Sequence, residues 1–268
     1  MSDRPGPASV LDAILARTRE RVAAERGRRP LGSSHPAVTQ APAVRPFAEA
    51  IARAGRVNVI AEHKRRSPSR GAIREDLLPA DVARGYERAG AAAISVLTDE
   101  PFFGGRIAHL EEVRAATGLP VLRKDFVLDP WQVWEARAAG ADAVLLIVAA
   151  LTEADLRGLL GIALEAGLDA LVEVHDRGEL DRALAVGARI VGVNNRDLRT
   201  LAVSLDTAVA LAPAIPDDVV AVAESGIRTG THLRRLRDAG FDAFLVGEHL
   251  MAAPDPGEAL ERLLEEAS

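Results

Sequence analysis

A short module recurs along the chain, in which a glycine is followed by an apolar run rich in Val, Ile and Leu. The copies are "AGRVNVIAE" from Ala54, "AGAAAISVLT" from Ala89, "TGLPVLRKD" from Thr117, "AGADAVLLIV" from Ala139, "AGLDALVEV" from Ala166, "VGARIVGVN" from Val186 and "AGFDAFLVG" from Ala239. Glycine readily adopts the left-handed conformation that ends a helix. The apolar run that follows is typical of a strand buried on both faces. "IPDDVVAVAES" from Ile215 fits the same position, with proline in place of glycine.

These runs predict eight strands, which begin near residues 57, 92, 120, 142, 169, 189, 219 and 242. Helical patterns such as "DPWQVWEARAAG" and "GTHLRRLRDAG" lie between them, and alternating strands and helices imply a parallel sheet. Eight such units in about 250 residues are the size of a (β/α)8 TIM barrel, an α/β fold. The alternative is an open doubly wound sheet, but that fold usually has fewer strands, and no GxGxxG follows the first predicted strand.

The residues before the first strand predict an N-terminal helical extension. Residues 8–26 read as an amphipathic helix, "RPLGSSHPAVTQAPAVRP" as a Pro-rich linker, and "PFAEAIARAG" as a second short helix. We therefore expect one domain over residues 1–268, with residues 1–54 capping the barrel formed by residues 55–268. The sequence leaves two arrangements open: the helices close the bottom of the barrel, or the linker lies over its top as a mobile lid.

Composition excludes several classes of site. The chain has no cysteine, so disulfides and thiolate nucleophiles are excluded, and its histidines show no metal-ligand spacing such as HExxH. We expect no metal and no cofactor. A net charge of −6 argues against a nucleic-acid surface. The start lacks a signal-peptide pattern and the longest apolar run, "AVLLIVAAL", is too short to span a bilayer, so we expect a soluble, cytoplasmic protein with no membrane partner. We further expect a monomer, although these features do not determine the oligomeric state.

Lysine is scarce, and its placement is informative. Of 33 Lys and Arg residues, only Lys64 and Lys124 are lysines, and both follow predicted strands. In a (β/α)8 barrel the active site lies at the carboxyl ends of the strands. Arginine keeps its proton in a protein, whereas lysine loses it where its surroundings depress its pKa. The pattern predicts a site that needs a proton donor or an amine nucleophile; the alternative is salt bridges alone.

Other strand ends also carry polar residues. Glu173 closes the otherwise apolar "ALVE", which indicates a carboxylate paired with a lysine, a general base, or both. Glu62 and Glu224 end two further strands. Asn194 and Ser225 are weaker signals, because such residues are more often structural hydrogen-bonding groups.

Glycines after the last two strands indicate a phosphate site. "AESGIRTG" and "VGEHLM" bring Gly226 and Gly247 to the position where this fold usually binds phosphate through backbone N–H groups. Arg66 and Ser67 in "KRRSPSRG" are candidate donors from the other side. Aromatic residues make up only 3% of the chain, so Phe103 and Phe126 near the barrel mouth suggest a flat apolar ring in the substrate.

Eight segments, in order over residues 57–251, resemble the successive signatures of the indole-3-glycerol-phosphate synthase family. They are "IAEHKRRSPSRG", "SVLTDEPFFGG", "VLRKDF", "DAVLLIVAAL", "LVEVH", "GVNNRDL", "AESGIR" and "FLVGEHLM". The resemblance implies a small sugar-phosphate substrate, 1-(2-carboxyphenylamino)-1-deoxyribulose 5-phosphate. Ring closure with loss of carbon dioxide and water would yield indole-3-glycerol phosphate, in tryptophan biosynthesis.

The resemblance also implies roles for the polar residues. Lys124 in "RKDF" matches the general acid of ring closure, and Glu173 in "LVEV" matches the acid–base carboxylate. Lys64 in "EHK" matches the lysine that binds the substrate carboxylate and takes part in dehydration, and Glu62 orients it.

The remaining matches concern substrate binding. Asn194 and Ser225 match polar residues around the sugar and the reacting oxygen, and Glu224 borders them. Positions matching the ring pocket are Phe103, Phe126 and Leu145, and positions matching the phosphate site are Arg196, Gly226 and Gly247. Glu248 departs from the pattern, since many relatives have serine there. A carboxylate beside a phosphate is unfavourable unless it points away and only its backbone N–H faces the ligand.

Two other functions fit parts of the pattern. A Schiff-base aldolase-like barrel would use Lys64 or Lys124 as a nucleophile. A catalytically silent barrel would only bind a sugar phosphate, although the presence of Lys64, Lys124 and Glu173 argues against it.

Overall fold

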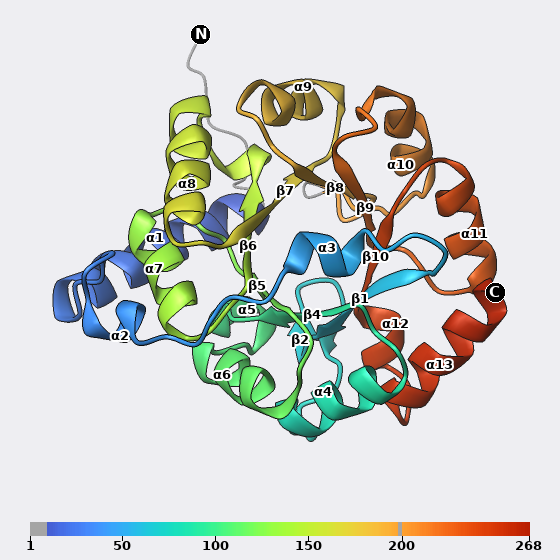
Figure 1. The fold of residues 1–268 in the computed structure, drawn as a ribbon, viewed down its shortest axis with the longest axis horizontal. Coiled ribbons are helices and arrows are strands. Elements are labelled where there is room, and N and C mark those ends of the chain that lie inside the picture. Colours follow the sequence, from blue (N-terminus) through green and yellow to red (C-terminus); the bar gives the residue numbers. More distant parts are fainter. Residues whose placement is uncertain (1–9, 198–199) are drawn as a thin grey trace, which may run out of the picture.

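The computed structural model describes residues 10–197 and 200–268. Within them a closed parallel barrel has the order β1-β10-β9-β8-β7-β6-β5-β4, surrounded by helices (Figure 1). Its strands are β1 (Asn58–His63), β4 (Ala93–Leu97), β5 (Val121–Lys124), β6 (Ala143–Ile147), β7 (Asp169–Val174), β8 (Ile190–Asn194), β9 (Val220–Glu224) and β10 (Ala243–Val246). The prediction of an eight-stranded TIM barrel is confirmed, and each strand begins within one residue of its predicted start.

Helices follow the strands as the repeated module predicts. The helices around the barrel are α4 (Pro79–Arg88), α6 (Ile107–Ala116), α7 (Pro130–Ala138), α8 (Glu153–Glu165), α9 (Arg177–Ala185), α10 (Asp206–Leu211), α11 (Gly230–Asp238) and α13 (Pro256–Ala267). Short elements fill the loops: α5 (Glu100–Phe103), α12 (Glu248–Met251), the 3-10 turns η1 (Val148–Ala150) and η2 (Ala212–Ala214), and the hairpin β2 (Arg66–Ser67) with β3 (Gly71–Ala72). None of the helices in the described ranges is long and apolar enough to cross a membrane.

The module glycines before most strands have positive φ, as expected of residues that end helices. Gly118 is the exception among them: α6 ends at an extended Thr117, and the Gly118 N–H donates to Glu87 Oε1 at 2.9 Å. A side-chain acceptor replaces the left-handed turn at this corner of the barrel.

Strand residues alternate between two apolar clusters. On β1, Ala61 packs in the cluster shared with the helices, whereas Ile60 packs in the cluster inside the barrel. Successive side chains of a strand point to opposite faces, so Glu62 faces inward like Ile60. By the same alternation Lys124 at the end of β5 lies on the inward face with Leu122. The polar residues that end the strands therefore project into the mouth of the barrel.

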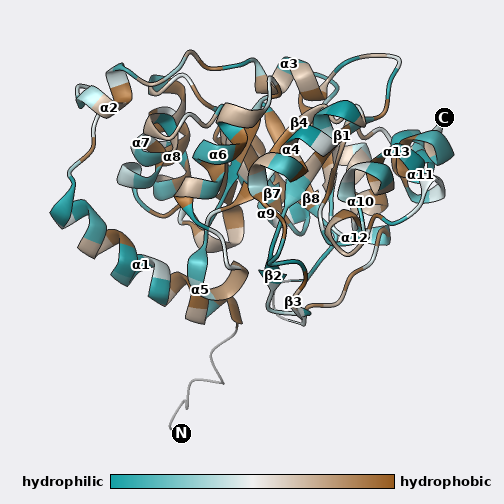
Figure 2. Cartoon of the chain, turned by 90° about the horizontal axis from the view of Figure 1, so that it is seen from below, coloured by the Kyte–Doolittle hydropathy of each residue, from teal (hydrophilic) through white to brown (hydrophobic). Residues whose placement is uncertain are grey.

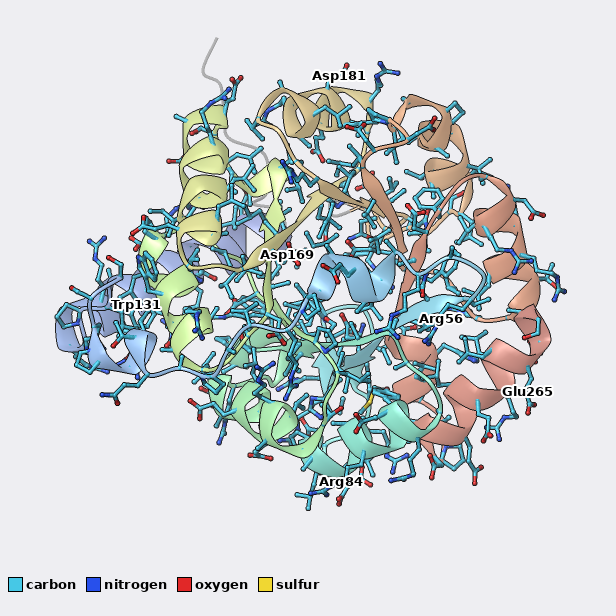
Figure 3. All side chains as sticks on the ribbon, in the orientation of Figure 1. Arg56, Arg84, Trp131, Asp169, Asp181 and Glu265 are labelled. Atoms are coloured by element: carbon cyan, nitrogen blue, oxygen red, sulfur yellow. The ribbon has the colours of Figure 1, made fainter. Side chains whose placement is uncertain are left out.

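The N-terminal segment is divided between the two ends of the barrel (Figure 2). Helix α3 (Phe47–Ile51) closes the amino-terminal end, where the Ala48 N–H donates to Asp169 at the start of β7, a residue labelled in Figure 3. Helix α1 (Val10–Arg28) lies at the opposite end, and its buried Ile14 packs in the interior cluster that includes Phe126. The predicted first helix began at residue 8; residues 8–9 lie outside the described part of the chain.

The linker between α1 and α3 runs beside the barrel and not over its mouth (Figure 1). It contains a short helix, α2 (Pro36–Thr39), that packs against α7. Its last residues meet the amino-terminal end of the barrel, where the Arg45 N–H donates to Asp142 Oδ1 at 2.6 Å. Helix α1, and not the linker, is thus the part of the extension nearest the mouth.

Candidate active site

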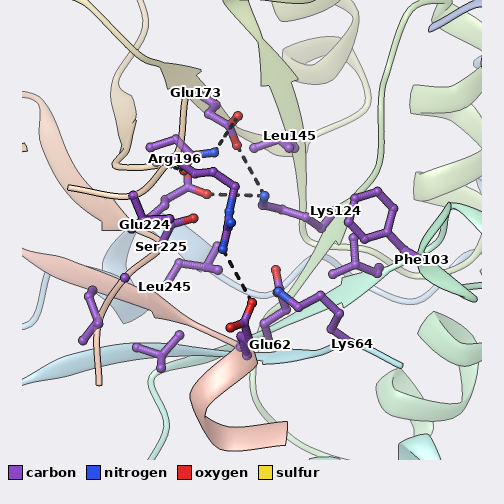
Figure 4. A pocket seen from close by; sticks show the side chains of 18 of the residues that line it. Glu62, Lys64, Phe103, Lys124, Leu145, Glu173, Arg196, Glu224, Ser225 and Leu245 are labelled. Atoms are coloured by element: carbon purple, nitrogen blue, oxygen red, sulfur yellow. Dashed lines mark hydrogen bonds and ion pairs between the residues drawn. The ribbon is translucent and has the colours of Figure 1, made fainter. Parts of the chain in front are cut away.

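A cavity of about 150 Å³ opens at the carboxyl ends of the strands (Figure 4). All of the predicted catalytic residues line it: Glu62, Lys64, Lys124, Glu173, Asn194 and Ser225. Of the predicted binding residues, the wall includes Phe103, Phe126, Leu145, Arg196, Glu224, Gly226, Gly247 and Glu248. The two lysines, which are 60 positions apart in sequence, thus reach the same space.

Lys124 lies between two buried carboxylates. Its Nζ is 3.3 Å from Glu173 Oε2 and 3.4 Å from Glu224 Oε2. Burial alone would lower the pKa of Lys124, but the negative charges of Glu173, Glu224 and Glu62 outweigh it and raise that pKa above its usual value. Lys124 is therefore a cation at neutral pH, which fits a proton donor better than a neutral amine nucleophile.

Glu173 is held in its ionised form by three neighbours. Asn194 Nδ2 donates to its Oε1 at 3.1 Å, Lys124 faces its Oε2, and His175 Nε2 lies 3.4 Å from its Oε1. Burial would raise the pKa of Glu173, but the positive charges of Lys124 and His175 and the hydrogen bonds lower it well below its usual range.

Glu224 ends β9, where it is paired with Asn194 of the neighbouring strand β8. Its environment raises its pKa, whereas the environment of Glu173 lowers the pKa of that residue. Burial and the neighbouring charges of Glu173 and Glu62 outweigh the attraction of Lys124 and raise the pKa of Glu224 to about 8. Its Oε1 is buried and has no hydrogen-bond partner among the described residues. Two carboxyl groups whose pKa values are pushed apart mark separate acid and base roles.

Two glycines make room for these carboxylates inside the barrel. A Cβ on Gly192 of β8 would overlap Glu224 Oε1, and a Cβ on Gly247 after β10 would overlap Glu62. Glu62 in turn receives Lys64, whose Nζ is 2.8 Å from Glu62 Oε1. Gly247, which was predicted only as a phosphate-binding residue, thus also makes room for Glu62. Gly192 makes room for Glu224 and was not predicted as a site residue.

The turn after β9 is constrained. Ser225 has φ 65°, a left-handed conformation that is uncommon for a residue other than glycine, and Gly226 follows with φ 80°. Asn195 fixes this turn, because its Nδ2 donates to the carbonyls of Glu224 at 3.0 Å and Ser225 at 3.2 Å, while its Oδ1 accepts from Ala208 N. The sequence shows Asn195 only as a polar residue after a strand, so its role as a clamp between loops was not predicted.

An apolar wall faces the charged centre. The rings of Phe103 and Phe126 have centroids 6.2 Å apart and are tilted by 37°, and the buried Leu145 of β6 adds to the same wall. Phe103 and Leu145 of this wall lie beside Lys124 and Lys64 (Figure 4).

Arginines surround Glu248 at the other end of the cavity. The Glu248 carboxylate lies 3.5 Å from Arg196, 3.5 Å from Arg70 and 3.9 Å from Arg228, which come from three different loops. The side chain therefore points toward these cationic groups and not away from them, and its negative charge offsets part of theirs.

Two predicted binding residues in the hairpin after β1, Arg66 and Ser67, do not line the cavity. Arg66 is exposed, is not part of the cavity wall, and lays its aliphatic stem against Gly104. Ser67 is buried in a smaller adjoining pocket of about 90 Å³ beneath α1, with its Oγ 3.3 Å from Ser69 Oγ. Contact of either residue with a substrate stays a prediction.

A buried arginine supports the strand that carries Lys124. Arg123 is 0% exposed and points away from the cavity, where its guanidinium contacts Asp125 at 3.1 Å and Glu135 at 2.8 Å. Arg21 of α1 also reaches Asp125, at 3.3 Å.

In residues 10–197 and 200–268, no group of three or more histidine, aspartate or glutamate side chains is arranged to hold a metal ion.

The fold and this site define a class: a (β/α)8-barrel enzyme with an acid–base centre at the carboxyl ends of its strands. The profile of the family described as "Indole-3-glycerol phosphate synthase" matches residues 11–263. The chain belongs to the indole-3-glycerol phosphate synthase family.

Relatives in full-length alignment support this assignment. The chain is 51% identical over 257 residues to an indole-3-glycerol phosphate synthase of Aromatoleum aromaticum, covering 95% of this chain and 98% of that one. It is 47% identical over 257 residues to the enzyme of that name from a Polaromonas species, covering 95% and 97%.

Solved structures that are more distant in sequence share the fold. Thiamine phosphate pyrophosphorylase from Pyrococcus furiosus has a TM-score of 0.58 at 20% identity, over 78% of this chain and 94% of that one. A mandelate oxidase variant has a TM-score of 0.60 at 20% identity, over 94% and 92%. At this identity the likeness concerns the barrel alone.

Proposed function

We propose that this chain catalyses the reaction of its family, the conversion of 1-(2-carboxyphenylamino)-1-deoxyribulose 5-phosphate to indole-3-glycerol phosphate, carbon dioxide and water. One observation carries the assignment of roles: Lys124 lies between Glu173 and Glu224 in the cavity that Lys64 also reaches. This arrangement places the Lys124 ammonium group within 3.4 Å of both an ionised carboxylate, Glu173, and a carboxyl group with a raised pKa, Glu224.

Binding uses the two ends of the cavity. The aromatic ring of the substrate packs on Phe103, Phe126 and Leu145, and its carboxylate pairs with Lys64, which Glu62 orients. The phosphate lies at the opposite end, near Arg196 and the backbone of Gly226 and Gly247. Because both anionic ends are fixed, the ring carbon is brought to the carbonyl carbon that it attacks.

Ring closure requires a proton at the carbonyl oxygen. Lys124 donates it as the new carbon–carbon bond forms, and Glu224, with a pKa raised to about 8, returns a proton to Lys124 across 3.4 Å. Asn194 and Ser225 lie beside this centre and hold the sugar hydroxyls. Carbon dioxide then leaves, and the electrons of the broken carbon–carbon bond restore the aromaticity of the ring.

Dehydration requires an acid and a base together. Lys64 supplies the proton with which the hydroxyl leaves as water. Glu173 is ionised because of Lys124 and His175, and it takes the proton released from the substrate as the indole forms.

The test is a direct assay of product. The purified chain, given the substrate, should produce the fluorescence of indole-3-glycerol phosphate, and a Lys124→Met variant that binds inorganic phosphate normally should produce it at least about 100-fold more slowly. A folded wild-type protein that binds the substrate and forms no product would instead support the catalytically silent barrel.

The Schiff-base alternative has an independent test. A nucleophilic lysine must be neutral, whereas the carboxylates around Lys124 raise its pKa. Borohydride added during turnover should therefore leave no covalent adduct. A trapped adduct on Lys64 or Lys124 would establish the aldolase-like mechanism.

We also propose that the chain acts as a monomer in the cytoplasm, with residues 1–54 and 55–268 forming one folded unit. One folded unit is supported by Ile14 of α1 and Phe47 of α3, which pack in the apolar cluster inside the barrel. Sedimentation equilibrium tests the monomer, and cell fractionation tests the location.

A further inference from the structure

A histidine and a glutamate lie behind Glu173, outside the set of residues assigned above. His175 follows β7, and its side chain is 13% exposed. Its Nε2 is 3.4 Å from Glu173 Oε1, and its Nδ1 is 3.0 Å from Glu179 Oε2 in the first turn of α9. The imidazole therefore lies between two carboxylates. Its Nδ1 is hydrogen-bonded to Glu179 on the surrounding helix, whereas its Nε2 makes a longer ion-pair contact, without a hydrogen bond, with Glu173 at the cavity.

Glu179 is held rigidly in this position. Its Oε2 also accepts the backbone N–H of His175 at 2.8 Å, and its own N–H donates to the side chain of Asp176, the N-cap of α9, at 2.9 Å. Its location is thus fixed by the start of the helix, and the imidazole is fixed by Glu179.

The charges alternate along this row of residues. Glu179, His175, Glu173 and Lys124 follow one another at 3.0, 3.4 and 3.3 Å. Burial alone would lower the pKa of His175, but the two carboxylates raise it to about 10, so the imidazole is doubly protonated at neutral pH.

We propose that His175 and Glu179 are positioning residues, which keep Glu173 ionised and hold its second oxygen toward Lys124. The proposal rests on the base role of Glu173 in the proposed function. Asn194 also restrains the Glu173 oxygen that His175 contacts, because its Nδ2 donates to Oε1 at 3.1 Å. The imidazolium contributes what an amide cannot, a positive charge that stabilises the carboxylate over its acid form.

The test compares neutral variants of the two residues across pH. In His175→Gln the acidic limb of the kcat/KM profile should move toward higher pH by about one unit, because Glu173 loses its cation. At a pH below the limb this is about a tenfold loss, and activity should recover as pH rises. Glu179→Gln keeps the imidazole beside Glu173, still protonated at acidic pH, so the limb should move by less than in His175→Gln. The double variant should be no worse than His175→Gln, because Glu179 acts through the imidazole.

Asp181→Asn is the matched control. Asp181 lies on the same helix and pairs with Arg177 at 2.8 Å, with its side chain 56% exposed (Figure 3). It should lose no activity at any pH. If His175 only helped to cap α9, folded His175→Gln would lower thermal stability and leave the limb where it is in the wild type, and that result would overturn the proposal.

A second measurement does not depend on turnover. Nitrogen NMR of the wild-type imidazoles should show His175 protonated on both nitrogens at pH 8, and in Glu179→Gln it should titrate at a lower pH. A neutral His175 at pH 7 in the wild type would also contradict the proposal. If the wild type makes no indole-3-glycerol phosphate while His175 titrates as expected, the proposed function fails and the charge arrangement stands.

Discussion

Replacing Glu224 by glutamine tests the electrostatics of the cavity through stability. The side chain is 1% exposed, and its pKa rises from the ordinary 4.5 to about 8 because burial and two neighbouring carboxylates disfavour its charge. The interval between 4.5 and about 8 is worth about 5 kcal/mol, at roughly 1.36 kcal/mol per pKa unit. Glutamine has the same shape and no charge, so Glu224→Gln removes this term.

The sign follows from proton binding. Between pH 4.5 and about 8 the folded state binds more protons at Glu224 than the unfolded state does, so stability from this group is fully present below pH 4.5 and is lost as pH rises through 8. The variant should therefore resemble the wild type near pH 4.5. At pH 9 it should be more stable, by at most about 5 kcal/mol.

Denaturant unfolding at several pH values, followed by the fluorescence of Trp131 and Trp134, measures the difference. Both indoles are buried on α7 and report on the folded barrel. Glu265→Gln, on the exposed outer side of α13, is the control and should leave the pH dependence unchanged (Figure 3). A Glu224→Gln stability difference that is the same at pH 5 and pH 9, or that favours the wild type at pH 9, would refute the reasoning.

Three further predictions address other parts of the molecule. Lys124→Arg keeps the positive charge but should lower kcat by roughly 100-fold or more, because a guanidinium does not release a proton; steady-state kinetics measures this. Glu248→Ser should bind inorganic phosphate about fivefold more tightly in calorimetry, because three partly exposed ion pairs worth about 1 kcal/mol together no longer compete. His63 is buried, and burial lowers its pKa to about 4. The wild type should therefore lose up to about 3 kcal/mol as pH falls from 6.5 to 4, and His63→Leu should lose less in the same denaturant titration.

The barrel was predictable because its sequence signal is repeated. Each strand is marked by a change from helical pattern to an apolar run, and burial on both faces allows few other assignments. Side chains of a strand alternate between its two faces, so Glu62 and Lys64 are expected on the same inward face as Ile60. That is why the strand-end residues were found in one cavity as expected.

Contacts between loops were not predictable in the same way. Asn195 clamps a turn that begins 29 residues later, and Glu248 meets Arg70 across 178 positions. Nothing in the local pattern around these residues specifies such partners. Likewise, one strand-end lysine among arginines indicates special chemistry, but the sign of its pKa shift depends on how many carboxylates surround it, which only the closed barrel determines.

The raised pKa of Lys124 changes the reason why a lysine is needed there. A guanidinium is planar and would pair with one carboxylate through two parallel bonds. An ammonium group is compact and has three donors. It can therefore contact Glu173 at 3.3 Å and Glu224 at 3.4 Å and still direct one proton into the cavity. The position thus favours lysine less for its ease of deprotonation than for its ability to pass a proton from Glu224 to a substrate oxygen.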